Sequence, residues 1–189
     1  GKSGSVAGAL PPYAELFTTL SFDPNVQAGL AAPESAGKLR IDIGRGWSDE
    51  VGKVLTDQLG QPAADAVKRL VEQTKVLDTD TALALALQQF AVPMELMAAA
   101  LDALTVSDDL YVPGRVDITR ARVEVLAAIP GVGKEKAAAI VAARGQLTEE
   151  ERRSRAWVLT KGVLTPAEFA KALPWMTPRC LQWRVRVQA

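Results

Sequence analysis

The chain has 189 residues, of which 48% are apolar and 23% are charged. This is the composition of a globular protein, and the length allows a sizeable core in one domain or in two small ones. There is no histidine, which removes the commonest general base, and the single cysteine, Cys180, cannot form an internal disulfide. The composition therefore argues against an enzyme and leaves the redox compartment open.

The net charge of zero conceals an asymmetry along the chain. Residues 1–113 carry 8 Lys/Arg against 15 Asp/Glu, a net charge of −7, whereas residues 114–189 carry 14 against 7, a net charge of +7. These two halves can neutralise each other across an internal interface. Alternatively, the basic half can meet phosphate or an acidic partner protein.

Residues 1–36 are interpreted as a lead-in to the folded region. The opening GKSGSVAG is typical of a cloning remnant or a flexible lead-in, so the natural chain is expected to begin upstream. No signal peptide or complete membrane span is visible. The most apolar stretch, Thr81–Val106, is interrupted by Pro93 and by polar residues, whereas a bilayer helix needs about 20 mostly apolar residues. We therefore expect two helices of a soluble region there.

Three short segments alternate between apolar and polar residues, which is the period of a half-buried strand. In Lys38–Ile43 the apolar residues are Leu39, Ile41 and Ile43, and in Arg115–Thr119 they are Val116 and Ile118. In the third segment Trp183, Val185 and Val187 alternate with Arg184, Arg186 and Gln188. We expect three short strands, two or three of which share a small sheet.

Between these segments the apolar spacing is helical. It predicts helices over Asp49–Leu59, Pro62–Gln73, Thr81–Phe90, Pro93–Leu104, Arg120–Ile129, Lys134–Arg144 and Pro166–Leu173. Asp80 or Thr81 can cap the third of these, and Thr165 can cap the last, which begins with a proline. The charged stretch Leu147–Arg155 is expected to cover a solvated face or a loop.

The chain also resembles itself. KLRIDI and the two helices after it are similar to GRVDIT and the two helices after it. Superposing Leu59 on Val132 places Gly60 on Gly133, Ala64 on Ala137 and Val67 on Ile140. Such a repeat suggests duplication of a strand, a helix, a tight turn and a second helix.

We therefore expect a predominantly helical α+β fold with two helix-hairpin-helix-like (SAM-like) units and a few short strands. The first strand and a degenerate unit occupy residues 37–112, and the second strand and a well-formed unit occupy residues 113–145. Residues 146–189 supply a C-terminal helix and the final strand.

The strongest local pattern is Leu126–Val141, LAAIPGVGKEKAAAIV, which is typical of a helix-hairpin-helix element. Gly131 and Gly133 allow positive φ in a very short turn. Val132 is expected to point into the gap between the helices, and Ala137 is small where they touch. Leu126, Ile140 and Val141 are expected to fill the shared core.

Such a hairpin can bind nucleic acid without reading its sequence. Its candidate residues are Gly131, Val132, Gly133, Lys134 and Lys136. Amide groups at the helix start can hold a phosphate oxygen, and the two lysines add salt-dependent attraction. Alternatively, the hairpin only packs two helices together and its lysines are solvated.

The segment GRVDITRARVEVLAAIPGVGKEKAAAIVAAR resembles K-type minor pseudopilins of the bacterial type II secretion system, in which a strand precedes a helix and a Pro-Gly turn. The tail is similar to the end of that family in Ala156–Leu159, Pro174–Thr177 and Trp183–Val187, and Ala14–Leu20 is similar to the phrase before its first strand. Asp117 and Thr119 replace the family's usual asparagine pair. GVGKEKA is more similar to DNA-binding hairpins than to the usual pseudopilin turn, and competence proteins that capture DNA carry a related strand-plus-hairpin unit.

The resemblance implies a non-catalytic subunit at the tip of a periplasmic secretion filament, with other minor pseudopilins as its partners. It also implies an inner-membrane anchor upstream of this sequence, and a helical insert within a pilin-like sheet. The edge of the last strand, Trp183–Val187, can then bind a partner, although Trp183 can equally be a core residue. Relatives bind calcium, so the resemblance allows calcium without assigning ligands. A DNA-binding module remains the alternative function.

No further chemistry is indicated. There is no cysteine and histidine cluster and no glycine-rich phosphate loop. The acidic groups Asp78-Thr79-Asp80 and Ser107-Asp108-Asp109 lack a full calcium loop and are expected to be caps or turns. We expect no catalytic residues, no metal ligands, no cofactor and no small-molecule substrate.

Overall fold

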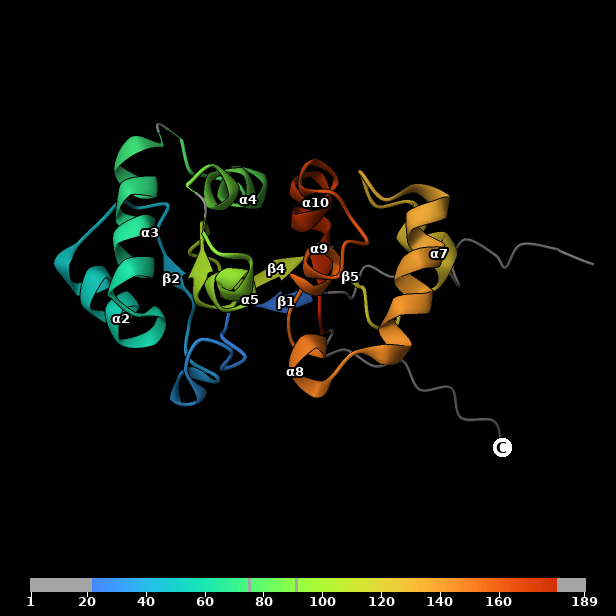
Figure 1. Cartoon of the computed structure of the whole chain (residues 1–189), viewed down its shortest axis with the longest axis horizontal. Coiled ribbons are helices and arrows are strands. Elements are labelled where there is room, and N and C mark those ends of the chain that lie inside the picture. The colour runs from blue at the N-terminus through green and yellow to red at the C-terminus, as the bar shows by residue number, and fades with distance from the viewer. Residues whose placement is uncertain (1–21, 75, 91, 180–189) are drawn as a thin grey trace, which may run out of the picture.

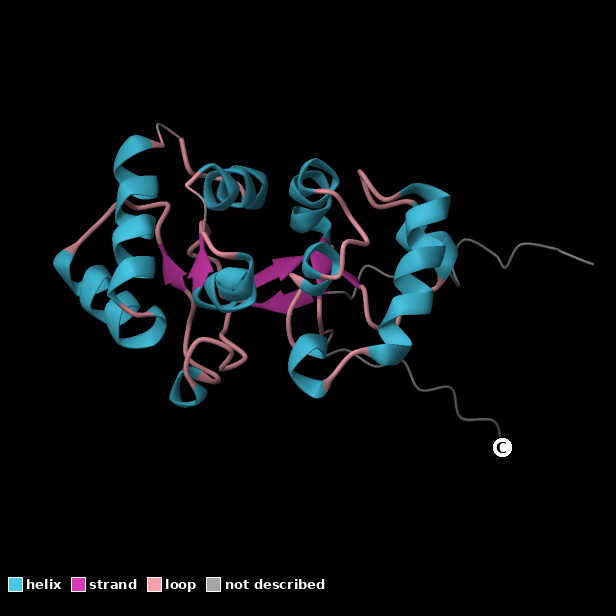
Figure 2. Cartoon of the chain, in the orientation of Figure 1, coloured by secondary structure: helices cyan, strands magenta, loops and turns pink. Residues whose placement is uncertain are grey.

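The computed structural model describes residues 22–74, 76–90 and 92–179 (Figure 1). The helices are α2 (Asp49–Leu59), α3 (Gln61–Gln73), α4 (Asp80–Gln89), α5 (Met94–Ala103), α6 (Val123–Ala127), α7 (Gly133–Ala143), α8 (Glu149–Arg152), α9 (Trp157–Thr160) and α10 (Pro166–Ala172). The strands are β1 (Phe22–Pro24), β2 (Ile41–Asp42), β3 (Leu104–Thr105), β4 (Tyr111–Pro113), β5 (Val116–Asp117) and β6 (Met176–Thr177). Short 3-10 helices lie at Pro33–Ser35, Arg144–Gln146 and Leu173–Trp175. The predicted predominantly helical α+β fold is confirmed (Figure 2).

The strands form three separate pairs. β1 pairs antiparallel with β4, whereas β2 pairs parallel with β3 and β5 pairs parallel with β6. The predicted strands near residues 38–43 and 115–119 therefore exist but do not share a sheet with each other. Each one pairs instead with a segment that follows several helices, because parallel strands need a long crossover connection.

The helix predictions differ from the structure mainly at helix starts. The helix predicted from Arg120 begins at Val123, because the amides of Arg120 and Ala121 both bind the carbonyl of Asp117 in a turn. Thr79, and neither Asp80 nor Thr81, caps α4 by accepting a hydrogen bond from the amide of Ala82 at 3.1 Å.

Thr165 caps α10 as predicted. Its hydroxyl accepts from the amide of Glu168, whose carboxylate in turn accepts from the amide of Thr165 at 2.7 Å. The charged stretch after α7 also contains a short helix, α8, with an equivalent capping box at Thr148. That stretch ends in a loop as predicted, but Ser154 and Arg155 in this loop are buried, so the stretch is not a solvated face throughout.

The internal repeat is visible in the backbone. In the first copy, the amide of Ile43 donates to the carbonyl of Thr105 at 3.0 Å. In the second copy, the amide of Ile118 donates to the carbonyl of Thr177, also at 3.0 Å. The hydroxyl of Thr105 accepts from the amide of Ser107 at 3.2 Å, and the hydroxyl of Thr177 accepts from the amide of Arg179 at the same distance. Each copy therefore runs from a short strand through helices to a parallel partner strand, β3 in the first and β6 in the second.

The helices follow the same repeat. α2 packs on α3 in the first copy as α6 packs on α7 in the second. Gly60 and Gly133, which the sequence superposed, both have positive φ at the start of the second helix, at 82° and 67°. The superposed Ala64 and Ala137 are both buried. Because β6 closes the second copy, residues 146–177 belong with residues 115–145 in one unit.

The two copies share a continuous core. α4 packs on α10 and α5 packs on α9, so the last two helices of each copy meet those of the other. The α2–α3 pair and α7 consequently lie at opposite ends of the molecule, with the β1–β4 pair between them (Figure 1). No helix in the described ranges is long and apolar enough to cross a membrane.

Candidate functional site

The predicted hairpin forms at the place indicated by the sequence. The amide of Val132 donates to the carbonyl of Ile129 at 3.0 Å, and Gly131 has a φ of 85°. Val132 is 5% exposed, and both Leu126 and Ala137 are fully buried. The turn lies where the sequence predicted it, and Val132, Leu126 and Ala137 are buried as expected, whereas Val141 is half-buried.

Gly131 lies against α10 of the same chain. A Cβ atom at this position would lie 2.8 Å from the carbonyl oxygen of Glu168 and 3.1 Å from Cβ of Lys171. A Cβ atom at Gly133 would meet nothing within 4 Å. The first glycine of the hairpin thus allows α10 to approach closely, whereas the second faces open space.

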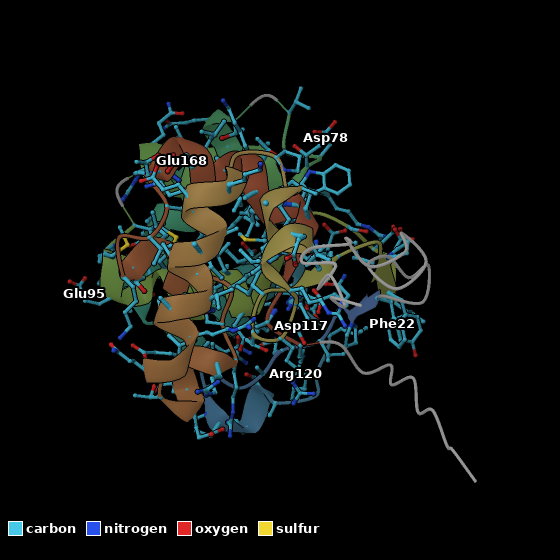
Figure 3. The ribbon with its side chains drawn as sticks, turned by 90° about the vertical axis from the view of Figure 1, so that its right-hand side faces the viewer. Phe22, Asp78, Glu95, Asp117, Arg120 and Glu168 are labelled. Carbon is cyan, nitrogen blue, oxygen red and sulfur yellow. The ribbon has the colours of Figure 1, made fainter. Side chains whose placement is uncertain are left out.

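The charges around the hairpin are mixed. Lys134 is exposed, but Nζ of Lys136 lies 3.9 Å from Oε2 of Glu168 (Figure 3 shows Glu168 beside the upper end of α7). Hydrogen bonds from the amide and then the hydroxyl of Thr165 hold the pKa of the Glu168 carboxyl below its usual value. A carboxylate therefore stands next to the surface proposed for phosphate and weakens its attraction for anions.

The second predicted site lies outside the described residues. It consists of Trp183, Arg184, Val185, Arg186 and Val187. The phrase Ala14–Leu20 lies outside them as well, so the structure bears on neither prediction.

The sequence reasoning missed a buried cluster of ionised side chains between the two copies. Oδ2 of Asp23 accepts from Nη1 of Arg115 at 2.6 Å and from Nη1 of Arg40 at 3.3 Å. Asp80 accepts from Arg115 and, at 3.3 Å, from Nη1 of Arg155. All five side chains are less than 10% exposed.

The cluster holds its carboxyl groups in the ionised form. Burial alone would raise the pKa of Asp23, but attraction from Arg40, Arg155 and Arg115 outweighs it and lowers that pKa. The pKa of Asp80 is lowered against burial in the same way, by Arg155 and Arg115. Burial, and then repulsion from Arg155, lower the pKa of Arg115 to about 10, so it remains a cation at neutral pH.

The positions of the arginines reflect the repeat. Arg40 and Arg115 each precede the first strand of their copy, and both bind the one carboxylate of Asp23. Asp80 belongs to the acidic half of the chain, whereas Arg115 and Arg155 belong to the basic half. This cluster supports the interpretation that the halves neutralise each other internally. The sequence signal was the shared Arg-(Ile/Val)-Asp-Ile pattern, but no signal pointed to Asp23.

The same cluster brings the start and the end of the described chain together. The hydroxyl of Thr177 donates to Oδ1 of Asp23 at 3.1 Å, and Nη2 of Arg179 donates to the carbonyl of Val26 at 2.8 Å. The chain consequently enters and leaves the helical body at one place.

The acidic motifs have structural partners. Asp80 is part of the buried cluster, Asp108 pairs with Arg45, and Asp109 accepts from the hydroxyl of Ser107 at 3.0 Å. Within residues 22–74, 76–90 and 92–179, no three His, Cys, Asp or Glu side chains gather in a way that could hold a metal ion.

The hairpin thus packs on α10, and the buried cluster joins the two copies of the repeat. No family model, no curated protein and no solved structure matches the chain.

Proposed function

We propose that the chain is a non-catalytic assembly subunit, a K-type minor pseudopilin that helps to form the tip of a type II secretion filament in the periplasm. Its partners would be the other minor pseudopilins of that filament. The observation that carries the proposal is the hydrogen bond between Thr177 and Asp23, which joins the two ends of the helical body.

A body whose ends meet at one place can be inserted into another structure without disturbing it. The family resemblance implies such an arrangement, with a large helical insert inside a pilin-like sheet. Residues 22–179 fit the insert in helical content, and the side chain of Arg179 contacts the carbonyl of Val26. The proposal assigns the work of the protein to its surfaces.

The hairpin favours this proposal over the DNA-binding alternative. Gly131 packs on α10, and Lys136 is already near a carboxylate of the same chain. Of the residues predicted to grip phosphate, Lys134 is the exposed cation that has no carboxylate within ion-pair distance in the described part of the chain. A single lysine gives weak, salt-sensitive attraction for a phosphate backbone.

A secretion assay in the organism that encodes the chain tests the proposal. Deleting the gene should leave the exported proteins in the periplasm, and the wild-type gene should restore export. A gene carrying Lys134→Glu and Lys136→Glu should restore export equally well, because the lysines take no part in assembly. Normal export by the deletion strain would refute the proposal.

The same double variant decides the alternative. Duplex DNA titrated at low and moderate salt should give flat curves with the wild-type protein. Micromolar, salt-sensitive binding that is lost in the double variant would establish the DNA-binding function instead.

A further inference from the structure

A groove of about 250 Å³ lies between α5, α8, α9 and the loop that follows β1. Its lining includes Leu30, Ala98, Thr148, Glu150, Glu151 and Trp157. None of these residues belongs to the hairpin or to the buried Asp/Arg cluster. The volume is smaller than that of a typical cofactor pocket, about 300–1,000 Å³, and suits one long side chain.

One side of the groove is apolar. Leu30 and Ala98 are half-buried there, and Trp157 is 1% exposed. The indole Nε1 of Trp157 is buried without a hydrogen-bond acceptor.

The other side of the groove is acidic and rigid. Glu151 accepts from the amide of Thr148 at 2.8 Å and lies 2.6 Å from Nζ of Lys161, so the capping box fixes the start of α8. Glu150 is exposed and makes no ion pair within the described ranges. No lysine or arginine of this part of the chain lines the groove. Glu150 is therefore the carboxylate of this rim that has no ion pair within the described ranges, whereas Glu151 is paired with Lys161.

We propose that this groove binds a basic side chain, lysine or arginine, of a neighbouring protein. The alkyl stem lies along Leu30 and Ala98, and the cation reaches the carboxylate of Glu150. Long basic side chains bury their stems on apolar surface while the charged end stays near a counter-charge or water. The chemistry thus selects a basic protein segment and rejects an acidic one.

The identification of the neighbour as another filament subunit rests on the proposed function, but the binding site does not. Peptide binding without assembly would refute the proposed function alone. Assembly without peptide binding would refute the groove alone.

The test is an NMR titration of the full chain with acetyl-Ala-Arg-Ala-amide, followed through the indole N–H signal of Trp157. Acetyl-Ala-Glu-Ala-amide is the matched control peptide. We expect a saturable shift with a millimolar midpoint for the arginine peptide and no saturable shift for the glutamate peptide. No shift with either peptide, or equal shifts with both, would overturn the inference.

Two variants locate the site. Glu150→Lys should weaken binding of the arginine peptide at least about tenfold. Glu135→Lys makes the same charge reversal at an exposed position of α7 and should leave the midpoint nearly unchanged. Ala98→Leu fills the groove and should also abolish the shift while the rest of the spectrum keeps its dispersion. Equal weakening by Glu150→Lys and Glu135→Lys would show general charge attraction instead of a groove.

Discussion

The hydroxyl of Thr177 donates a hydrogen bond of 3.1 Å to the carboxylate of Asp23, which lies 154 positions earlier in the chain. The other oxygen of that carboxylate binds Arg115 from the second copy of the repeat and Arg40 from the first. One buried acidic group therefore ties together both copies and the two ends of the body. The stability of the protein should depend on it.

Replacing this acid should destabilise the protein strongly. Asp23→Ala leaves Arg40 and Arg115 buried with less compensation, which typically costs about 3–5 kcal/mol. Asp108→Ala breaks an exposed pair with Arg45 and should cost less than about 1 kcal/mol. Urea unfolding at pH 7 measures both free energies of unfolding. Similar values for the two variants would show that the buried cluster contributes no more than a surface pair.

The cluster also predicts how stability changes with pH. Attraction from the arginines leaves the pKa values of Asp23 and Asp80 lower in the folded protein than in the unfolded chain. Such groups stabilise the fold above the unfolded pKa of about 4, and this contribution is lost as the pH falls through the folded pKa. The free energy of unfolding should therefore be nearly constant from about pH 5 to 7 and should fall below about pH 4.

A substitution assigns that acid sensitivity to the cluster. Asp80→Asn should be less stable than wild type at pH 7 but should lose less stability between about pH 5 and 3, because it has one fewer carboxylate to protonate. Asp57→Asn, on the exposed side of α2, is the control and should follow the wild-type curve. A wild-type pH slope in Asp80→Asn would contradict the assignment.

The repeat provides a matched pair of threonines. Thr105 and Thr177 make the same local turn, but only Thr177 also binds Asp23. The single hydroxyl proton of Thr177 is shared between Asp23 at 3.1 Å and the carbonyl of Arg179 at 2.7 Å. Thr177→Val should therefore cost about 1 kcal/mol more than Thr105→Val, because it also removes the contact with a buried carboxylate. Chemical unfolding of the two variants gives the difference, and a difference near zero would remove any role for this contact in stability.

The two hairpin glycines should respond differently to alanine. At Gly133 the cost is only that of a positive φ, about 1–2 kcal/mol. At Gly131 the added Cβ also meets the backbone of α10, and overpacking adds about 1–3 kcal/mol. In thermal or urea unfolding, Gly131→Ala should therefore be less stable than Gly133→Ala. The opposite order would mean that α10 does not press on the hairpin.

Much of the fold follows from local sequence patterns. The helices from Asp49 to Leu59 and from Gly133 to Ala143 have clear apolar spacing, and glycines mark the turns before α3 and α7. These signals are read from neighbouring residues, so the sequence is sufficient to locate them. The superposition of Gly60 on Gly133 also anticipated two units of the same construction.

The pairing of strands and the buried cluster could not be found in this way. Ile41 pairs with Leu104 across a whole helical unit, and no local pattern specifies that partner. Arginines usually lie at the surface, yet Arg40 and Arg155 are both buried and pair with carboxylates from other segments of the chain. The contact of Asp23 with Thr177 depends on the whole fold being in place.

Complex formation tests the central claim most directly. The full chain would be co-expressed with the soluble regions of the other minor pseudopilins from the same genome and analysed by size-exclusion chromatography with native mass spectrometry. The proposed function predicts a complex of fixed stoichiometry that survives moderate salt. Separate elution of the chain, together with salt-sensitive micromolar binding to duplex DNA, would contradict it.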